Sequence, residues 1–119
     1  MKKHVHISVP IYKSWVYVVS DIDECIKLSA CKTGMRLTPD DFDGNGMTIS
    51  GWMRNIVWLP VGADFDTIAH ECMHVVLNIF KTKGVEVDTD NQEPTAYLMG
   101  YITHQVIKAH NKLKEKNNG

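Results

Sequence analysis

The segment from Asp66 to Gly84, DTIAHECMHVVLNIFKTKG, constrains this chain more than any other stretch. Apolar residues surround most of it when it is drawn as a helix, and such a helix is expected to be buried. Its polar residues share one stripe, because positions three and four apart stack on one helical face. They are Thr67, His70, Glu71, His74 and Asn78. A buried carboxylate and two buried imidazoles are costly without partners. The segment therefore predicts a long core helix whose polar stripe needs a partner.

The polar stripe contains an HExxH pattern, formed by His70, Glu71 and His74. Two imidazoles one turn apart can bind one Zn²⁺, and a glutamate beside them can take a proton from the bound water. Zinc in such a site needs a further protein ligand and an open position. Glu93 is the candidate, because we expect it at the start of the next helix. The alternative is a metal-free globular protein in which both histidines hydrogen-bond within the core.

The remaining patterns predict strands in the first half of the chain and helices around and after the motif. Alternation before Pro10 and a run of β-branched and aromatic residues after it each indicate a strand. The expected strands are 5–9, 14–20, 47–50 and 55–59, with turn chemistry at 38–46. His4 and His6 share a face of the first strand, and we interpret them as exposed polar positions rather than metal ligands.

Helix caps set the expected helix ends. Ser20 or Asp21 can cap a helix over 21–32, and Asp64 or Asp66 can cap the motif helix, which Gly84 would end. A polar connection follows at 85–91, and a long helix is expected over 92–113, with a proline tolerated in its first turn.

Composition indicates one globular domain spanning 1–119. The chain has 119 residues, of which 44% are hydrophobic, and a net charge of −1, so nothing indicates a nucleic-acid or membrane partner. No signal peptide or transmembrane run is expected. Three cysteines without a framework spacing favour a reducing, cytoplasmic setting.

These residues resemble the zincin metallopeptidases, and in particular the gluzincin branch, in which a glutamate on a later helix completes HExxH. The matching residues are His70, Glu71, His74 and Glu93. Over nearly its whole length the chain is also similar to short HExxH proteins of bacteriophages and prophages, which would place it in the host cytoplasm. The fold expected is a minimal zincin-like α+β domain. A mixed or antiparallel sheet of about four strands packs against the active-site helix and a C-terminal helix, with one N-terminal helix besides.

The resemblance implies a zinc-dependent peptidase that acts on a peptide or protein, with Glu71 as general base. Zincins place an edge strand before the active-site helix, and we expect extended substrate to pair with that strand. The residues in that place are Asn55, Ile56, Val57, Trp58 and Leu59.

Further candidates come from helical spacing after Glu93 and around the motif. Because we expect no second lobe, an oxyanion could be stabilised by residues on one face of the last helix, namely Tyr97, Tyr101 and His104. Packing and solvation are the competing interpretation of these three residues. Ligands could be oriented by hydrogen bonds from Thr67, Asn78 and Asp90. The competing function is a non-catalytic zinc-binding module that binds a host or regulatory protein through the edge strand or a Trp52/Trp58 surface.

Overall fold

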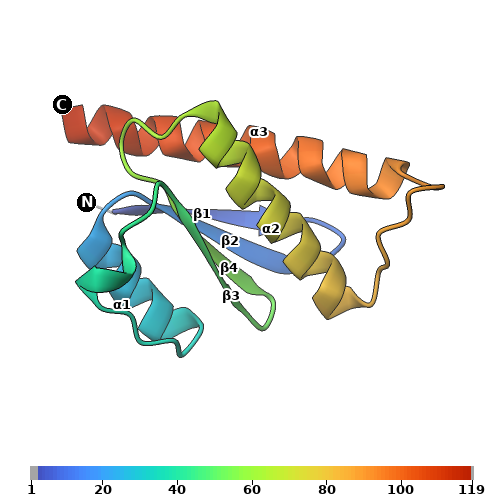
Figure 1. The fold of residues 1–119 in the computed structure, drawn as a ribbon, viewed down its shortest axis with the longest axis horizontal. Helices are drawn as coiled ribbons and strands as arrows, with labels where there is room; N and C mark the ends of the chain where they lie inside the picture. Colours follow the sequence, from blue (N-terminus) through green and yellow to red (C-terminus); the bar gives the residue numbers. More distant parts are fainter. Residues whose placement is uncertain (1–2, 119) are drawn as a thin grey trace.

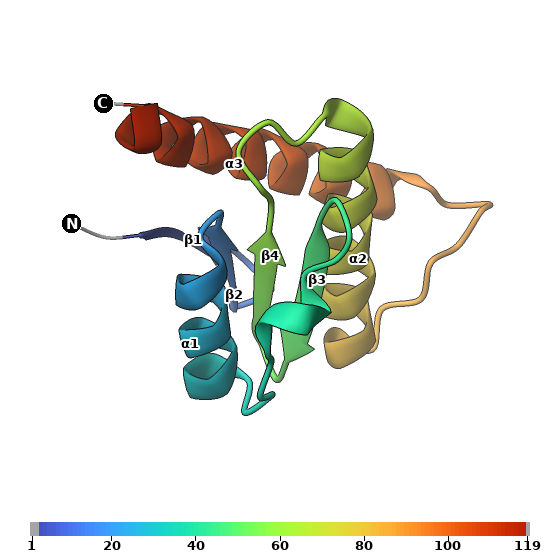
Figure 2. The ribbon, with the colours of Figure 1, turned by 60° about the vertical axis from the view of Figure 1, so that its left-hand side comes forward.

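A four-stranded sheet with helices on both faces forms the core of the chain. The computed structural model describes residues 3–118. Its elements in chain order are β1 (His4–Val9), β2 (Ser14–Val19), α1 (Ile22–Lys32), the 3₁₀ turn η1 (Pro39–Asp41), β3 (Met47–Gly51), β4 (Arg54–Trp58), α2 (Phe65–Lys83) and α3 (Glu93–Asn118). Figure 1 shows α2 and α3 crossing over the sheet, and Figure 2 shows α1 on its other side.

The sheet has the order β1-β2-β4-β3 and is mixed. β1 pairs antiparallel with β2 and β3 pairs antiparallel with β4, while β2 and β4 run parallel in the centre. The expected α+β class with a small mixed sheet and three helices is therefore confirmed.

Side-chain alternation along the two central strands divides the core into two halves. Val16, Val18 and Val57 face the layer of α2 and α3, whereas Tyr17 and Ile56 face α1. Both faces of β2 and β4 are thus covered, as expected of interior strands.

The expectation that 55–59 forms an edge strand is wrong. β4 pairs with β2 on one side and β3 on the other, so β1 and β3 are the edge strands. Four consecutive residues, Ile56 to Leu59, are buried. The strand that precedes α2 therefore sits in the middle of the sheet because it has apolar residues for both faces. Trp58 is among these residues and donates its indole N–H to the Ser20 carbonyl 3.0 Å away, so it offers no surface with the exposed Trp52.

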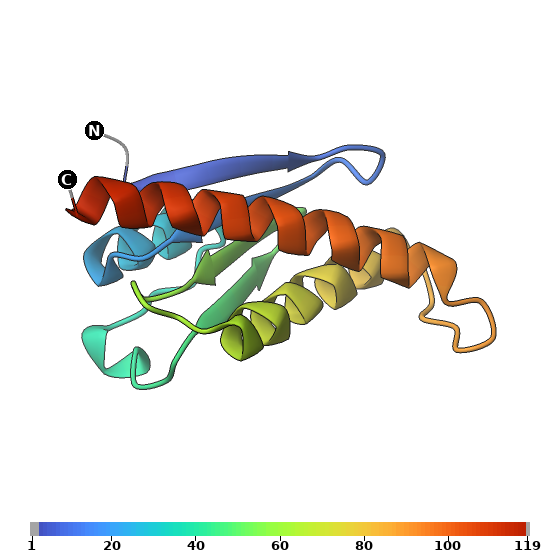
Figure 3. The ribbon, with the colours of Figure 1, turned by 90° about the horizontal axis from the view of Figure 1, so that it is seen from above.

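The caps of the helices follow the local sequence. Asp21 accepts from the Glu24 N–H at the start of α1, and Gly84 ends α2 with a φ of 69°. The connection 84–92 then projects beyond the end of the sheet before α3 returns across it (Figure 3). Among residues 3–118, no helix is both long and apolar enough to cross a membrane.

Candidate metal centre

The apolar residues of α2 fix its orientation on the sheet. Ile68, Cys72, Val75, Val76 and Ile79 are buried against the sheet and α3. Asp64 caps the helix by accepting from the Thr67 N–H at 3.0 Å, and this bond lowers the pKa of its carboxyl group. The helix therefore presents the opposite stripe to solvent.

His70 and His74 lie on that stripe and are exposed. The expectation that both imidazoles are buried is wrong, because α2 lies along the β3 side of the sheet and no element of residues 3–118 covers its outer face. Exposure leaves both rings accessible to a metal ion from solution.

The two imidazoles converge on one point. Their Nε2 atoms are 3.3 Å apart and their rings are tilted by 75°. Two Zn–N bonds of about 2.0–2.1 Å at a tetrahedral angle would separate the nitrogens by about 3.3–3.4 Å. The spacing of this pair therefore fits two ligands of one zinc ion. The same separation is also that of an N–H···N hydrogen bond between the two rings, the alternative to a metal.

Glu71 is buried and is held by the neighbouring strand. Thr48 of β3 donates its hydroxyl to Glu71 Oε1 at 2.7 Å and lies 3.3 Å from the Glu71 carbonyl oxygen. A carboxylate that is 6% exposed thus has a hydrogen-bond partner next to the histidine pair.

Gly46 lets the start of β3 approach α2. A Cβ atom at this position would lie 2.8 Å from Thr67 Cγ2 and 3.3 Å from Glu71 Cγ. The absence of a side chain therefore permits the contact that places Thr48 against Glu71. Neither Gly46 nor Thr48 was predicted to support the site. The sequence around Gly46 indicates only a turn, and no local pattern links Thr48 to a helix that begins at residue 65.

Glu93 lies in the first turn of α3 and is exposed. The described residues contain no group of three His, Cys, Asp or Glu side chains spaced to hold a metal ion. α3 begins on the side of the molecule where α2 ends (Figure 1), whereas His70 lies in the second turn of α2 and His74 at its middle. The structure brings the two histidines together without Glu93, whose role as a ligand stays a prediction.

Thr67, Asn78 and Asp90, which were predicted to orient the metal ligands, have other partners. Asn78 donates to Asn55 Oδ1 at 3.0 Å and so ties α2 to the central strand β4. The Thr67 methyl packs against Gly46. Asp90 lies in the exposed connection before α3, where its N–H donates to Asp88. None of these hydrogen bonds reaches His70 or His74.

Tyr97 and Tyr101, which were predicted to stabilise an oxyanion, lie near β1, at the edge of the sheet opposite β3. The Tyr101 hydroxyl donates to the Ser8 carbonyl of β1 at 3.2 Å, and Tyr97 is 75% exposed over the β1–β2 turn. β2 and β4 separate that edge from β3. His104 is exposed on α3. The structure does not bring these side chains to the histidine pair.

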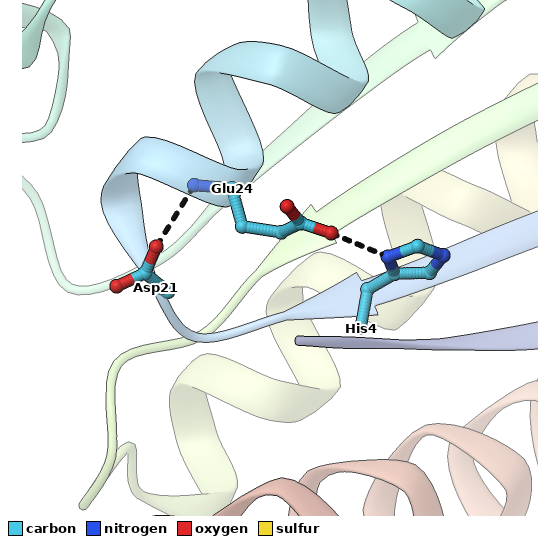
Figure 4. Close-up of polar contacts among 3 residues, drawn as sticks. All are labelled: His4, Asp21 and Glu24. Atoms are coloured by element: carbon cyan, nitrogen blue, oxygen red, sulfur yellow. Dashed lines mark hydrogen bonds and ion pairs between the residues drawn. The ribbon is translucent and has the colours of Figure 1, made fainter. Parts of the chain in front are cut away.

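Cys72 and the two N-terminal histidines have surroundings of their own. Burial raises the pKa of Cys72 to about 11, so its thiol stays neutral at pH 7. His4, expected to be exposed, is half-buried and donates through Nδ1 to Glu24 at 2.6 Å, which ties β1 to α1 (Figure 4). His6 stacks on Tyr17 with ring centroids 4.9 Å apart.

Comparison with protein-family models, with curated proteins and with solved structures finds no significant match to this chain. The similarity to zincins therefore rests on the residues of α2 and on Glu93. The structure defines a mixed α+β domain with an exposed histidine pair on α2.

Proposed function

We propose that this chain is a zinc-dependent metallopeptidase. The observation that carries the proposal is the 3.3 Å separation of the His70 and His74 Nε2 atoms beside a buried carboxylate. That spacing matches two zinc ligands, and the glutamate follows the first histidine directly, as in HExxH enzymes.

The proposal gives one role to each of four residues on α2 and β3. His70 and His74 hold the zinc through Nε2. Zinc, when bound, lowers the pKa of a water molecule to about 7 and polarises a carbonyl oxygen. Glu71 accepts the proton of the attacking water and passes it to the leaving amine. Thr48 keeps the Glu71 carboxylate in place through its 2.7 Å hydrogen bond.

Substrate in this proposal lies along β3 rather than β4. β3 is an edge strand, and Thr48 in its middle contacts Glu71. An extended peptide that pairs with the outer edge of β3 would run past α2 beside the general base. The three free cysteines accord with a reaction in a reducing cytoplasm.

Glu93 completes the ligand set in this proposal. Glu93 follows the connection 84–92. For Glu93 to bind the same zinc ion as the histidines, this connection and the first turn of α3 must shift toward them. Spectroscopy of a Co²⁺-substituted chain would report the number of protein ligands, and Glu93→Ala should change that spectrum.

The decisive test compares wild type with Glu71→Gln, both loaded with zinc, on a library of extended peptides. Glu86→Gln is the matched control, because Glu86 is an exposed carboxylate in the connection. We expect all three proteins to bind one zinc ion per chain by elemental analysis. We expect cleavage by wild type and Glu86→Gln, and none by Glu71→Gln.

A non-catalytic zinc-binding module is the second candidate. The observation that favours it is the 74% exposed Trp52 in the turn after the edge strand β3, where it could contact a partner protein. Zinc binding with no cleavage by any of the three proteins would replace the peptidase by this module. A chain that takes up no zinc would refute both candidates.

A further inference from the structure

Two adjoining cavities lie between β1 and α3, at the edge of the sheet opposite β3. One of about 190 Å³ lies between Val5–Ser8 and the side chains of Gln105, Lys108 and Lys112. The other, of about 250 Å³, lies between the β1–β2 turn and the first turns of α3. Tyr101 lines both. We call this pair of cavities the β1–α3 groove.

The charge of the groove differs from that of the chain. Lys108 and Lys112 are exposed, stand one helical turn apart, and line the first cavity. Among the described residues, no acidic side chain lines either cavity, although the chain has 14 acidic residues and a net charge of −1. One end of the groove is therefore complementary to carboxylates.

The other end is apolar and contains a strained, exposed residue. Ile11 has a φ of 68° and is 91% exposed, and Tyr12 N–H donates to the Pro10 carbonyl at 2.7 Å. This is a γ-turn with a left-handed central residue, a rare turn that is costly for a β-branched side chain. Packing within the described chain does not offset that cost, because Ile11 is almost fully exposed. Strain of this kind, of order 1–3 kcal/mol, is characteristic of binding sites.

The shape of the groove favours an extended occupant. β1 is an edge strand, so its outer side pairs with no other strand of residues 3–118. Tyr97 and Lys112 are separated by about 22 Å along α3, which an extended chain covers with about seven residues.

We propose that the β1–α3 groove binds an extended acidic segment of a partner protein. Apolar side chains of that segment contact Ile11 and Tyr97, and its Asp or Glu side chains contact Lys108 and Lys112. This site is separate from the histidine pair, since β2 and β4 lie between the two edges of the sheet. The proposal therefore does not depend on zinc binding or on peptidase activity.

The test uses a library of random 12-residue peptides displayed on yeast and selected against the full chain. We expect enriched sequences to place an apolar cluster about seven residues from Asp or Glu. The best peptide, made synthetically, should bind the double variant Lys108→Glu/Lys112→Glu at least about tenfold more weakly. Lys27→Glu/Lys81→Glu is the matched control, because both lysines are exposed on other elements and the change in charge is the same.

Ile11→Gly separates a binding role from a structural one. Glycine takes a positive φ at no steric cost, so the variant should melt close to the wild-type temperature while binding the peptide at least about tenfold more weakly. His70→Ala should bind the peptide as wild type does, which distinguishes this site from the proposed peptidase site.

Three results would overturn the proposal. The library could yield no enriched peptide, or peptides without acidic residues. The lysine double variant could bind as well as its control. A 12-nucleotide single-stranded DNA could compete as well as the peptide, which would show that charge alone decides binding.

Discussion

Replacing Gly46 by alanine should loosen the contact between β3 and α2. The distances around Gly46 allow the loss of stability to be estimated. The new Cβ would lie 2.8 Å from Thr67 Cγ2 and 3.3 Å from Glu71 Cγ, so one of these must move. Overpacking of this kind costs about 1–3 kcal/mol. Alanine also restricts the unfolded chain, which returns about 0.4–1 kcal/mol. We expect Gly46→Ala to lower the free energy of unfolding by about 1–2 kcal/mol.

Three further variants make this prediction specific. Gly44→Ala is the matched control, because its nearest contact would be the Gly46 carbonyl at an ordinary 3.7 Å. It should leave stability unchanged or raise it by about 0.5 kcal/mol. Thr67→Ser removes the Cγ2 methyl, so Gly46→Ala/Thr67→Ser should recover about 1 kcal/mol relative to the sum of the single changes.

Urea unfolding of wild type and the four variants, followed by circular dichroism, measures these differences. If Gly46→Ala and Gly44→Ala have the same midpoint and slope, the close approach of β3 to α2 is wrong. The assignment of Thr48 as the partner of Glu71 would fail with it, since both depend on the same contact.

The remaining predictions concern the histidine pair, its glutamates and a buried histidine. Thr48→Val should reduce peptide cleavage about tenfold or more at unchanged zinc content, whereas Thr48→Ser should cleave as wild type does. Equal cleavage by the two variants would rule out positioning of Glu71 by the Thr48 hydroxyl. Glu93→Ala should weaken zinc binding in a competition with a chromophoric chelator, and an unchanged affinity would exclude it as a ligand. Burial, and secondarily the charge of Lys114, lowers the pKa of His110, whose two ring nitrogens have no partner in the described chain. The unfolded chain therefore binds this proton more readily, and stability should fall as pH drops below about 6.5. His110→Leu should flatten that dependence in melts between pH 8 and pH 5, and an unchanged slope would contradict it.

Local chemistry was enough to predict the four strands, the starts of the three helices and the end of α2, whereas α3 continues to Asn118, beyond the expected end at 113. Asp21 and Asp64 cap the helices as expected, and Gly84 ends α2 in the left-handed conformation. These features depend on neighbours a few residues away, which the sequence lists in order.

The order of the strands could not be obtained in the same way, because it depends on pairing between distant segments. The run Ile56 to Leu59 did contain a signal, since consecutive apolar residues are typical of a strand covered on both faces. The expectation of an edge followed the zincin resemblance instead.

The exposure of the histidine pair and the contact between Thr48 and Glu71 both follow from the position of β3 at the sheet edge. An apolar pattern shows which residues of α2 are inside, but it does not show where the sheet stops. Only the pairing of β3 with β4 brings Thr48 to Glu71.

The packing of α3 on the first hairpin has a consequence for synthesis on the ribosome. Ile7, Val9, Val16 and Val18 are covered by residues of α3 that extend to Leu113. At about 5–20 residues per second, translation leaves this apolar face bare for about 5–20 s after β2 has been made. The first hairpin can therefore bury this face only after α3 has left the exit tunnel, so the core is completed late in synthesis.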